Sequence, residues 1–197
     1  TQNGGALTVA GTSSFTLGAN SANVVLDHAS NAFSGAVTLL AGAGGSQTFG
    51  NVTFVDDSAV KIDANADAAG DLYLNAGTDG AVGGNLVVTA TTGNITQGVA
   101  VAVTGTSAFT TSASDADITL SNTSNALGGT VAFSTAGTTG NVVIDNGTTA
   151  LDFAASTING TLTATGGASA GIVDSGNVAV AGNVTLTTDA GNGVINM

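Results

Sequence analysis

Short runs in which apolar and polar residues alternate recur along the whole chain. In each run the apolar residues stand at positions i and i+2, as in Val24-Val25-Leu26 and Leu72-Tyr73-Leu74. Because successive side chains of a β-strand point to opposite faces, one face of such a strand is buried and the other carries Thr, Ser or Asn. The runs follow one another at intervals of roughly 10–15 residues, and Gly, Asn, Ser and Asp fill the intervals as turn residues do. The pattern predicts an all-β protein with many very short strands.

Two long copies of one sequence follow each other. Residues 6–16 read ALTVAGTSSFT and residues 100–110 read AVAVTGTSAFT, an offset of 94 residues (from 6 to 100). The same offset places His28 on Asn122 and Asn31 on Asn125, and it later drifts to about 90. A third copy begins near Gly182. We therefore expect one domain, residues 1–197, made of two repeats of about 95 residues, 1–95 and 96–197.

The repeat favours a stacked fold over a sandwich, because stacked coils require a sequence period and sandwiches do not. The strands are short and numerous for the chain length, and the two-residue Asn-Gly turns of β-hairpins are rare. We predict a parallel β-helix, or β-solenoid, with about 20 residues per coil and roughly ten coils. Since Asn31 and Asn125 share one repeat position, we also expect an Asn ladder at a corner of the coil.

The composition removes several classes of function. The net charge is −12, and all 13 acids are Asp, opposed by the single base Lys61. Without a basic surface the chain cannot neutralise phosphates, which excludes nucleic acid as a partner. One His and no Glu leave little for acid–base catalysis, so we expect no enzyme. No Cys is present, which excludes a disulfide scaffold and a zinc–thiolate site. No apolar run approaches the ~20 residues of a membrane-spanning helix, so membrane insertion is not expected.

The densest acidic stretch is the one candidate for a cofactor. Its sequence, DANADAAGD, places Asp63, Asp67 and Asp71 four residues apart. Hard cations bind clustered carboxylate oxygens, so these three residues form a candidate Ca²⁺ site. Their spacing matches neither an EF-hand loop nor the calcium-binding nonapeptide repeat. The alternative is a solvated loop whose Asp side chains keep the chain soluble.

Other polar side chains have simple structural explanations. The repeat partner of His28 is an Asn, which indicates a position that needs only a polar side chain. Lys61 lies on the strand face opposite Val60 and Ile62, next to Asp63. Tyr73 also faces outward, where an aromatic ring can contact a sugar. The alternating Thr residues of 161–165 suit an outer strand face, and they would bind ice only if such rows align on one flat face.

Three phrases carry a family resemblance: GNLVVTATTGNITQ at 84–97, AVAVTGTSAF at 100–109 and NTSNALGG at 122–129. They resemble the repeats of bacterial filamentous haemagglutinin-type exoproteins, and the resemblance covers most of the chain. It implies a right-handed parallel β-helix, secretion across a bacterial outer membrane and a role as a long surface stalk or adhesin. The amino-terminal secretion domain of that family has no match in this sequence.

We therefore expect a structural segment of a secreted or cell-surface bacterial filament, stalk or adhesin. The alternative is an ice- or glycan-binding β-solenoid module. Residues 193–197 joined to Thr1 and Gln2 recreate the phrase at 93–97, so we expect the chain to stack end to end with itself or within a longer chain. Exposed strand edges at both ends favour the same pairing. A host or neighbouring cell surface is the other expected partner.

Overall fold

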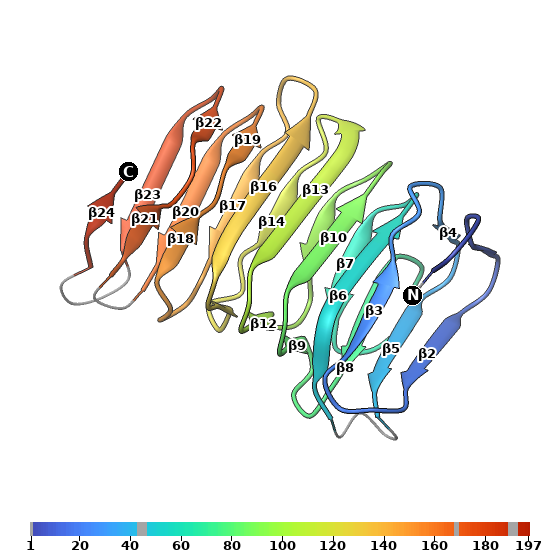
Figure 1. Cartoon of the computed structure of the whole chain (residues 1–197). Helices are drawn as coiled ribbons and strands as arrows, with labels where there is room; N and C mark the ends of the chain where they lie inside the picture. Colours follow the sequence, from blue (N-terminus) through green and yellow to red (C-terminus); the bar gives the residue numbers. More distant parts are fainter. Residues whose placement is uncertain (1, 43–46, 168–169, 189–192) are drawn as a thin grey trace.

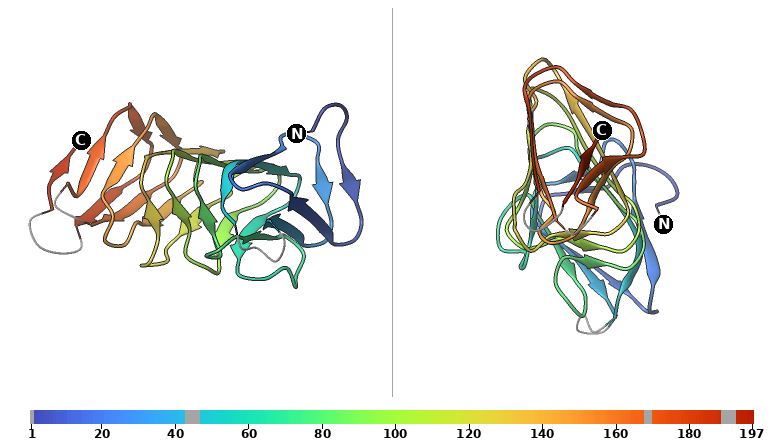
Figure 2. Two further views of the ribbon diagram at one scale, coloured as in Figure 1. Left: turned by 60° about the horizontal axis from the view of Figure 1, so that its bottom comes forward. Right: turned by 90° about the vertical axis from the view of Figure 1, so that its left-hand side faces the viewer.

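The chain folds as a β-solenoid of about seven turns, which confirms the predicted fold class (Figure 1). The computed structural model describes residues 2–42, 47–167, 170–188 and 193–197. Within these ranges every paired strand runs parallel to its neighbours, and no helix is present. Two long sheets face each other along the stack, and successive turns lie side by side (Figure 2).

One long sheet has nine strands. In spatial order they are β2 (Ser13–Leu17), β5 (Val37–Ala41), β8 (Asp71–Asn75), β7 (Val60–Asp63), β11 (Ile95–Gln97), β14 (Ile118–Leu120), β17 (Val142–Asp145), β20 (Leu162–Gly166) and β23 (Val184–Thr188).

The other long sheet has thirteen strands. Its principal strands are β3 (Ala22–Leu26), β6 (Phe49–Asp56), β10 (Leu86–Ala90), β13 (Ser107–Ser114), β16 (Thr130–Ala136), β19 (Ser156–Ile158) and β22 (Val178–Val180). Short strands flank them: β9 (Ala81–Val82), β12 (Ala102–Val103), β15 (Ala126–Leu127), β18 (Leu151–Phe153), β21 (Ile172–Asp174) and β24 (Ile195–Asn196). A separate two-stranded sheet pairs β1 (Thr8–Val9) with β4 (Ala32–Phe33).

The number of turns is smaller than the roughly ten predicted. Contacts between adjacent turns join residues 20 apart at Asn141 and Thr161, but 34 apart at Asn51 and Asn85. The prediction of about 20 residues per coil was wrong for the first half of the chain: neighbouring strands are offset by 24 residues between β2 and β5 and by 28 between β3 and β6, and the turn from Asn51 to Asn85 also contains the additional strand β8.

At the acid-rich stretch the chain steps back by one strand along the axis of the solenoid. β7 and β8 are consecutive in sequence, yet they pair in parallel within the nine-stranded sheet, with Ile62 opposite Leu72. The spatial order β5-β8-β7-β11 means that the chain advances to β7 and then steps back to β8. Residues 64–70 make this backward connection. The nine-stranded sheet thereby gains a strand that the opposite sheet does not match.

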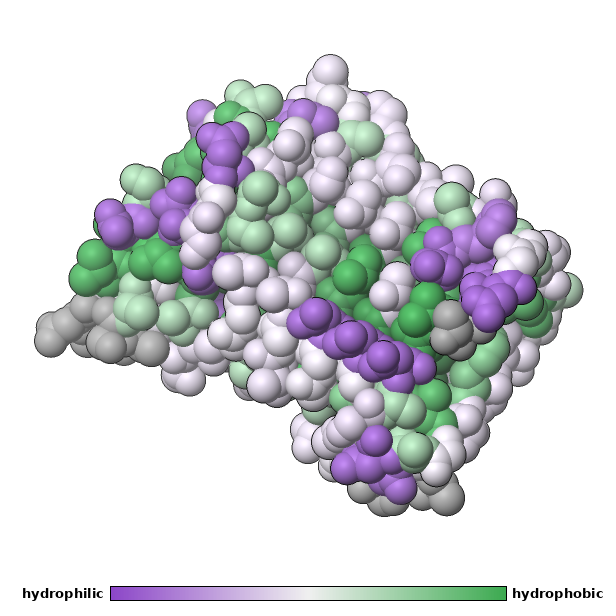
Figure 3. Space-filling model, in the orientation of Figure 1, coloured by the Kyte–Doolittle hydropathy of each residue, from purple (hydrophilic) through white to green (hydrophobic). Residues whose placement is uncertain are grey.

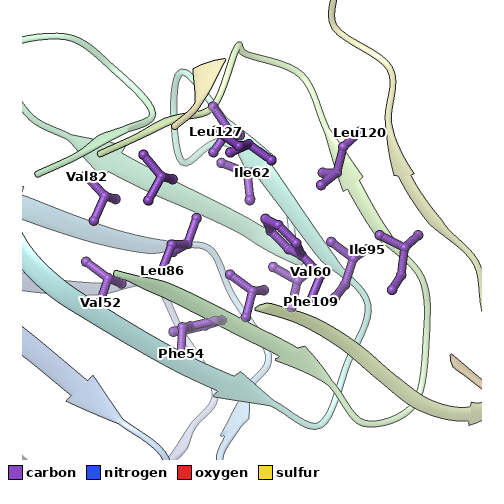
Figure 4. Close-up of a cluster of buried hydrophobic side chains, with 14 of the residues drawn as sticks. Val52, Phe54, Val60, Ile62, Val82, Leu86, Ile95, Phe109, Leu120 and Leu127 are labelled. Atoms are coloured by element: carbon purple, nitrogen blue, oxygen red, sulfur yellow. The ribbon is translucent and has the colours of Figure 1, made fainter. Parts of the chain in front are cut away.

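The core is a column of inward-facing apolar residues between the two long sheets. Phe rings of successive turns lie close together: Phe33 and Phe54 are 5.6 Å apart between ring centroids, and Phe109 and Phe133 are 5.9 Å apart. In Figure 4 the side chains of Phe54 and Phe109 point into the same interior as that of Val60 from the opposite sheet. Residues that alternate with these along the strands face outward, as the sequence pattern predicts.

Three inward-facing strand positions hold a Ser instead of an apolar residue. The hydroxyls of Ser13 and Ser107, which share one repeat position, are buried and have no hydrogen-bond partner. Ser156 is also buried, but its hydroxyl donates to the carbonyl of Ala154 at 2.8 Å and accepts the N–H of Phe133 at 3.0 Å. A buried hydroxyl without a partner loses its hydration and receives nothing in exchange.

We therefore expect Ser107→Ala to raise the free energy of unfolding by about 1 kcal/mol, since it removes an unpaired polar group and hardly changes the volume. The matched change Ser156→Ala should lower it by a similar amount, because the N–H of Phe133 then loses its acceptor. Urea unfolding of the two variants beside the parent chain checks both signs. Destabilisation by Ser107→Ala would contradict the assignment of an unpaired hydroxyl.

Candidate functional site

Many of the polar side chains that form hydrogen bonds between neighbouring turns lie at the corners, where strands begin. In the thirteen-stranded sheet, the Oδ1 of Asn23 accepts the backbone N–H of Asn51 in the next turn at 2.7 Å. Asn51 accepts the N–H of Asn85 at 2.9 Å, and Asn85 accepts that of Thr106 at 2.9 Å. These bonds satisfy backbone donors at the point where strand pairing begins. A row of hydrophilic residues crosses this face in Figure 3.

The nine-stranded sheet has a second ladder of the same design. Asn94 Oδ1 accepts the N–H of Asp117 at 2.9 Å, and Asp117 Oδ1 accepts the N–H of Asn141 at 2.7 Å. Asn141 Oδ1 in turn accepts the N–H of Thr161 at 2.9 Å and its hydroxyl at 2.8 Å. An Asn ladder was predicted, but at Asn31 and Asn125. The recurrent Gly-Asn dipeptide before an apolar run is the sequence signal for these two ladders.

Glycines stand next to the first ladder and let the turns approach each other. The N–H of Gly84 donates to the carbonyl of Gly50 at 3.1 Å, and that of Gly105 donates to the carbonyl of Gly84 at 3.0 Å. A Cβ added at Gly105 would lie 2.7 Å from the Gly84 oxygen, closer than side chains tolerate. Gly is therefore required here by the closeness of two backbones.

Asn31 and Asn125 occupy corners of another kind. Asn31 pairs with Gln2 through two side-chain hydrogen bonds, at 2.8 and 3.0 Å, and Asn125 pairs with Gln97 in the same way, at 2.8 and 2.9 Å. Both Asn side chains are buried. The Gln partners were not predicted, although the Thr-Gln dipeptide at 1–2 and at 96–97 marks them.

His28 has a structural role in the same corner. Its Nδ1 accepts the N–H of Ser30 at 3.1 Å, and Asn122 Oδ1 accepts the N–H of Ser124 at 2.9 Å in the second repeat. The two side chains therefore close the same local turn. This matches the expectation that the position needs only a polar side chain.

Asp115 connects two turns at a strained corner. Its φ is 62°, and Ser21 at the equivalent position of the first repeat has a φ of 57°. Asp115 Oδ1 accepts the N–H groups of Thr138 at 2.7 Å and Thr139 at 2.8 Å, and these bonds lower the pKa of its carboxyl to about 2. Its contribution to stability is complete above the ordinary pKa of 3.8 and is lost as the pH falls towards 2.

The structure brings two of the three candidate calcium ligands together around a base. Asp63 forms an ion pair with Lys61, and the Oδ1 of buried Asp71 lies 4.0 Å from Lys61 Nζ. The hydrogen bond from Lys61 lowers the pKa of Asp63. Asp67 is exposed in the connection between β7 and β8. The described residues contain no group of three or more His, Cys, Asp or Glu side chains that could hold a metal ion, so the calcium site stays a prediction without support from this geometry.

Tyr73 is less isolated than its sequence suggests. Its hydroxyl donates to Asp79 Oδ1 at 3.1 Å, and it lies in register between Thr38 and Asp63 on the outer face of the nine-stranded sheet. The pKa of Tyr73 is raised, first by burial and to a smaller extent by its hydrogen bond to Asp79 and the charge of that carboxylate.

Hydroxyl side chains form an aligned row on the outer face of the thirteen-stranded sheet. The strand registers place Thr89 beside Thr110, Thr110 beside Ser134, and Ser134 beside Thr157. The Thr residues of 161–165 belong to a shorter row. Thr163 has a Thr beside it on one neighbouring strand, Thr185, but Val143 on the other. An aligned hydroxyl row therefore exists, but not where the Thr-rich sequence 161–165 indicates it.

Asp56 occupies a corner that the second repeat fills with a neutral side chain. Asp56 Oδ1 accepts the N–H groups of Phe33 and Asp57, both at 2.9 Å, and Oδ2 accepts the hydroxyl of Ser58 at 2.8 Å. Burial raises the pKa of Asp56 in spite of these bonds. At the equivalent corner, Asn146 Oδ1 accepts the N–H of Leu127 at 2.8 Å, and its Nδ2 donates to two carbonyl oxygens.

We expect Asp56→Asn to raise the free energy of unfolding at pH 7 by on the order of 1 kcal/mol, because it removes a buried charge and keeps the acceptor for Phe33. A raised pKa means that the parent chain loses stability as the pH rises from the unfolded value through the folded one. The advantage of Asp56→Asn should therefore shrink as the pH falls. Urea unfolding at a series of pH values measures this.

Asp115→Asn is the matched control, and its effect at pH 7 should have the opposite sign. The pKa of Asp115 is lowered, so its charge favours the folded state. If both variants shifted stability in the same direction at pH 7, the distinction between the two carboxylates would be wrong.

Comparison with known proteins gives one match. A family model described as "Repeats of unknown function (DUF5649)" matches residues 1–40, 49–134 and 139–197, which is nearly the whole chain. No curated protein matches the chain. No solved structure matches it. The described residues contain no helix that could cross a lipid bilayer.

Proposed function

We propose that the chain, which belongs to the family of repeats of unknown function DUF5649, is a structural segment of a secreted or cell-surface bacterial filament, stalk or adhesin of the filamentous haemagglutinin type. The observation that carries the proposal is the continuous ladder of backbone and side-chain hydrogen bonds along the stack. Such ladders resist bending because each turn is bonded to the next along two long sheets.

The surface suits a rod that must remain dispersed in water. Outward positions carry Thr, Ser and Asn, and the chain has a net charge of −12. Like charges keep rods apart, and a nearly base-free surface gives nonspecific anionic partners nothing to bind. Recognition of a host or neighbouring cell would then belong to particular loops rather than to the shaft.

End-to-end continuation of the stack is part of the same proposal. Among the residues that the structure describes, β23 pairs only with β20 and β24 only with β21, so each has one edge without a strand partner there. Val184, Ile195 and Met197 are about half exposed there (49, 48 and 50%). A further turn, from the same chain or from another copy, would cover these side chains and pair these edges.

Electron microscopy of the native protein isolated from its source tests the scaffold role. We expect rods of uniform width that lengthen by about 4.8 Å per turn, the spacing of paired strands. Gly105→Ala should shorten or break the rods, because its Cβ would collide with the Gly84 backbone. The control Gly18→Ala, where a Cβ meets nothing within 4 Å, should leave them intact. Compact particles from the parent protein would refute the proposal.

One observation favours ice binding as a second candidate function. The row from Thr89 to Thr157 repeats a hydroxyl at the strand spacing over four consecutive turns. Flanking outward positions on these strands are small, as Ala108 and Ala132 are. The glycan-binding version has less support, because Tyr73 is the one aromatic residue that the described residues place on an outer face.

Thermal hysteresis of the purified chain tests the ice-binding alternative. A functional row should give a measurable gap between melting and freezing. Thr110→Tyr should abolish the gap, because a ring in the middle of the row prevents flat contact. Thr119→Tyr, at an outward position on the opposite sheet, should preserve it. A parent chain with no hysteresis would exclude this function.

A further inference from the structure

The outermost strands of the stack have equivalents in the middle of the chain. β2 lies at one end of the nine-stranded sheet and β23 at the other (Figure 1). The sequence AVAGNVTLTT at 179–188 resembles AVGGNLVVTA at 81–90, and TVAGTSSFTL at 8–17 resembles AVTGTSAFTT at 102–111. β22 and β23 are therefore equivalent to β9 and β10, and β1 and β2 are equivalent to β12 and β13.

In the middle of the chain the equivalent strands pair with one another. β10 pairs with β13, which places Leu86 opposite Ser107 and Val88 opposite Phe109. β9 pairs with β12 in the same way. We call this contact between two successive turns the internal junction. Its inward-facing side chains are covered from both sides, and Leu86, Val88 and Phe109 are all fully buried.

The equivalent side chains at the two ends of the stack lack such a cover. Val184, the equivalent of Leu86, is 49% exposed. Phe15, the equivalent of Phe109, is only partly buried, and together with Leu7 it lines a cavity of about 370 Å³. Each end therefore presents one half of the internal junction, with the strand that would complete it at the opposite end of the chain.

A glycine in the first turn gives a second, independent indication. A Cβ on Gly105 would lie 2.7 Å from the carbonyl oxygen of Gly84, so the internal junction requires Gly there. The equivalents of Gly105 and Gly84 are Gly11 and Gly182. A Cβ added at Gly11 meets no described atom within 4 Å, so no close approach within the described chain requires this Gly. The backbone of Gly182 from another copy would require it.

We propose that a second copy of this chain docks on β1 and β2 through its own β22 and β23, in the register of the internal junction. Val184 of the second copy then lies opposite Ser13, and Leu186 of the second copy lies opposite Phe15. The contact is head to tail, so its repetition produces an open filament. This junction rests on the end-to-end continuation in the proposed function, and it adds the partner, its direction and its register.

Polar groups at the same corner fit this register. In the internal junction the Oδ1 of Asn85 accepts the N–H of Thr106 at 2.9 Å. The equivalents of these two residues, Asn183 and Thr12, are both exposed in the single chain. In the docked pair Asn183 of the second copy accepts the N–H of Thr12, which satisfies a backbone donor at the end of the stack.

Single cysteine variants test the partner and the register, since the chain has no Cys of its own. Thr185 and Ser14 are exposed and lie opposite each other in the proposed register. A mixture of Thr185→Cys and Ser14→Cys chains should give the mixed dimer as its main product under mild oxidation. Opposite residues on neighbouring strands are about 4.8 Å apart, which suits a disulfide. Mass spectrometry distinguishes the mixed dimer from the two homodimers.

The matched control mixes Thr185→Cys with Thr16→Cys. Thr16 is exposed like Ser14, but it lies two residues further along β2. The two Cα atoms would then be about 8 Å apart, which is too far for a disulfide. The yield of mixed dimer should therefore be several-fold lower. Equal yields from the two mixtures would overturn the register, and no mixed dimer from either would overturn the docking of a second copy.

Gly11→Ala tests the same junction without a disulfide. Its stability to urea should not fall, because the new Cβ lies in open space in the single chain. Its association constant in sedimentation should fall by about tenfold or more, because the Cβ would collide with Gly182 of the second copy. Gly18→Ala also places its Cβ in open space, but outside the junction, and should associate like the parent chain.

Two results would overturn the proposal: equal association of Gly11→Ala and the parent chain, or a parent chain that stays monomeric at high concentration. Either result would leave the stalk role standing, because that role fails only if the native protein forms compact particles.

Discussion

The whole structure depends on satisfying the backbone N–H groups at the corners. A solenoid has no hairpins, so at each corner the chain must leave one sheet and enter the other without losing contact with the turn before it. Asn and Asp side chains do this at the start of strands by accepting an N–H from the following turn, as Asn51 does for Asn85. Glycines beside them allow the backbones to touch, as at Gly84 and Gly105. Once the corners are closed, parallel pairing and the apolar column follow from simple alternation.

The alternation and the repeat were sufficient to predict an all-β solenoid, because both are local properties of the sequence. The number of turns was not predictable, since a corner of five residues and a corner of ten look alike in composition. The step from β7 back to β8 could not be predicted from the sequence pattern either. Val60-Lys61-Ile62 and Leu72-Tyr73-Leu74 have ordinary strand patterns. They differ from other pairs of consecutive strands only because they pair with each other in one sheet instead of lying in opposite sheets.

The candidate sites were predictable to the extent that they are local. His28 closes a turn within three residues, and its Asn equivalent indicated as much. The hydroxyl row from Thr89 to Thr157 depends on the register between four turns of unequal length, which no single segment encodes. The acid-rich stretch stands out by composition, but the geometry places Asp63 and Asp71 beside Lys61.

The corner geometry also explains why the acids that connect neighbouring turns are Asp and not Glu. A carboxylate that must reach the N–H of the next turn, as Asp117 reaches Asn141 and Asp115 reaches Thr138, needs the same single methylene as Asn. Glu would carry its oxygens past that donor. Asn and Asp therefore have the same reach but differ in charge. At the exposed corner of Asp115, hydrogen bonds from backbone N–H groups lower the pKa of the carboxyl. At the corner of Asp56, burial raises it. Part of the negative charge of the chain is in this way carried by residues that also close its turns, Asp56, Asp115 and Asp117 among them.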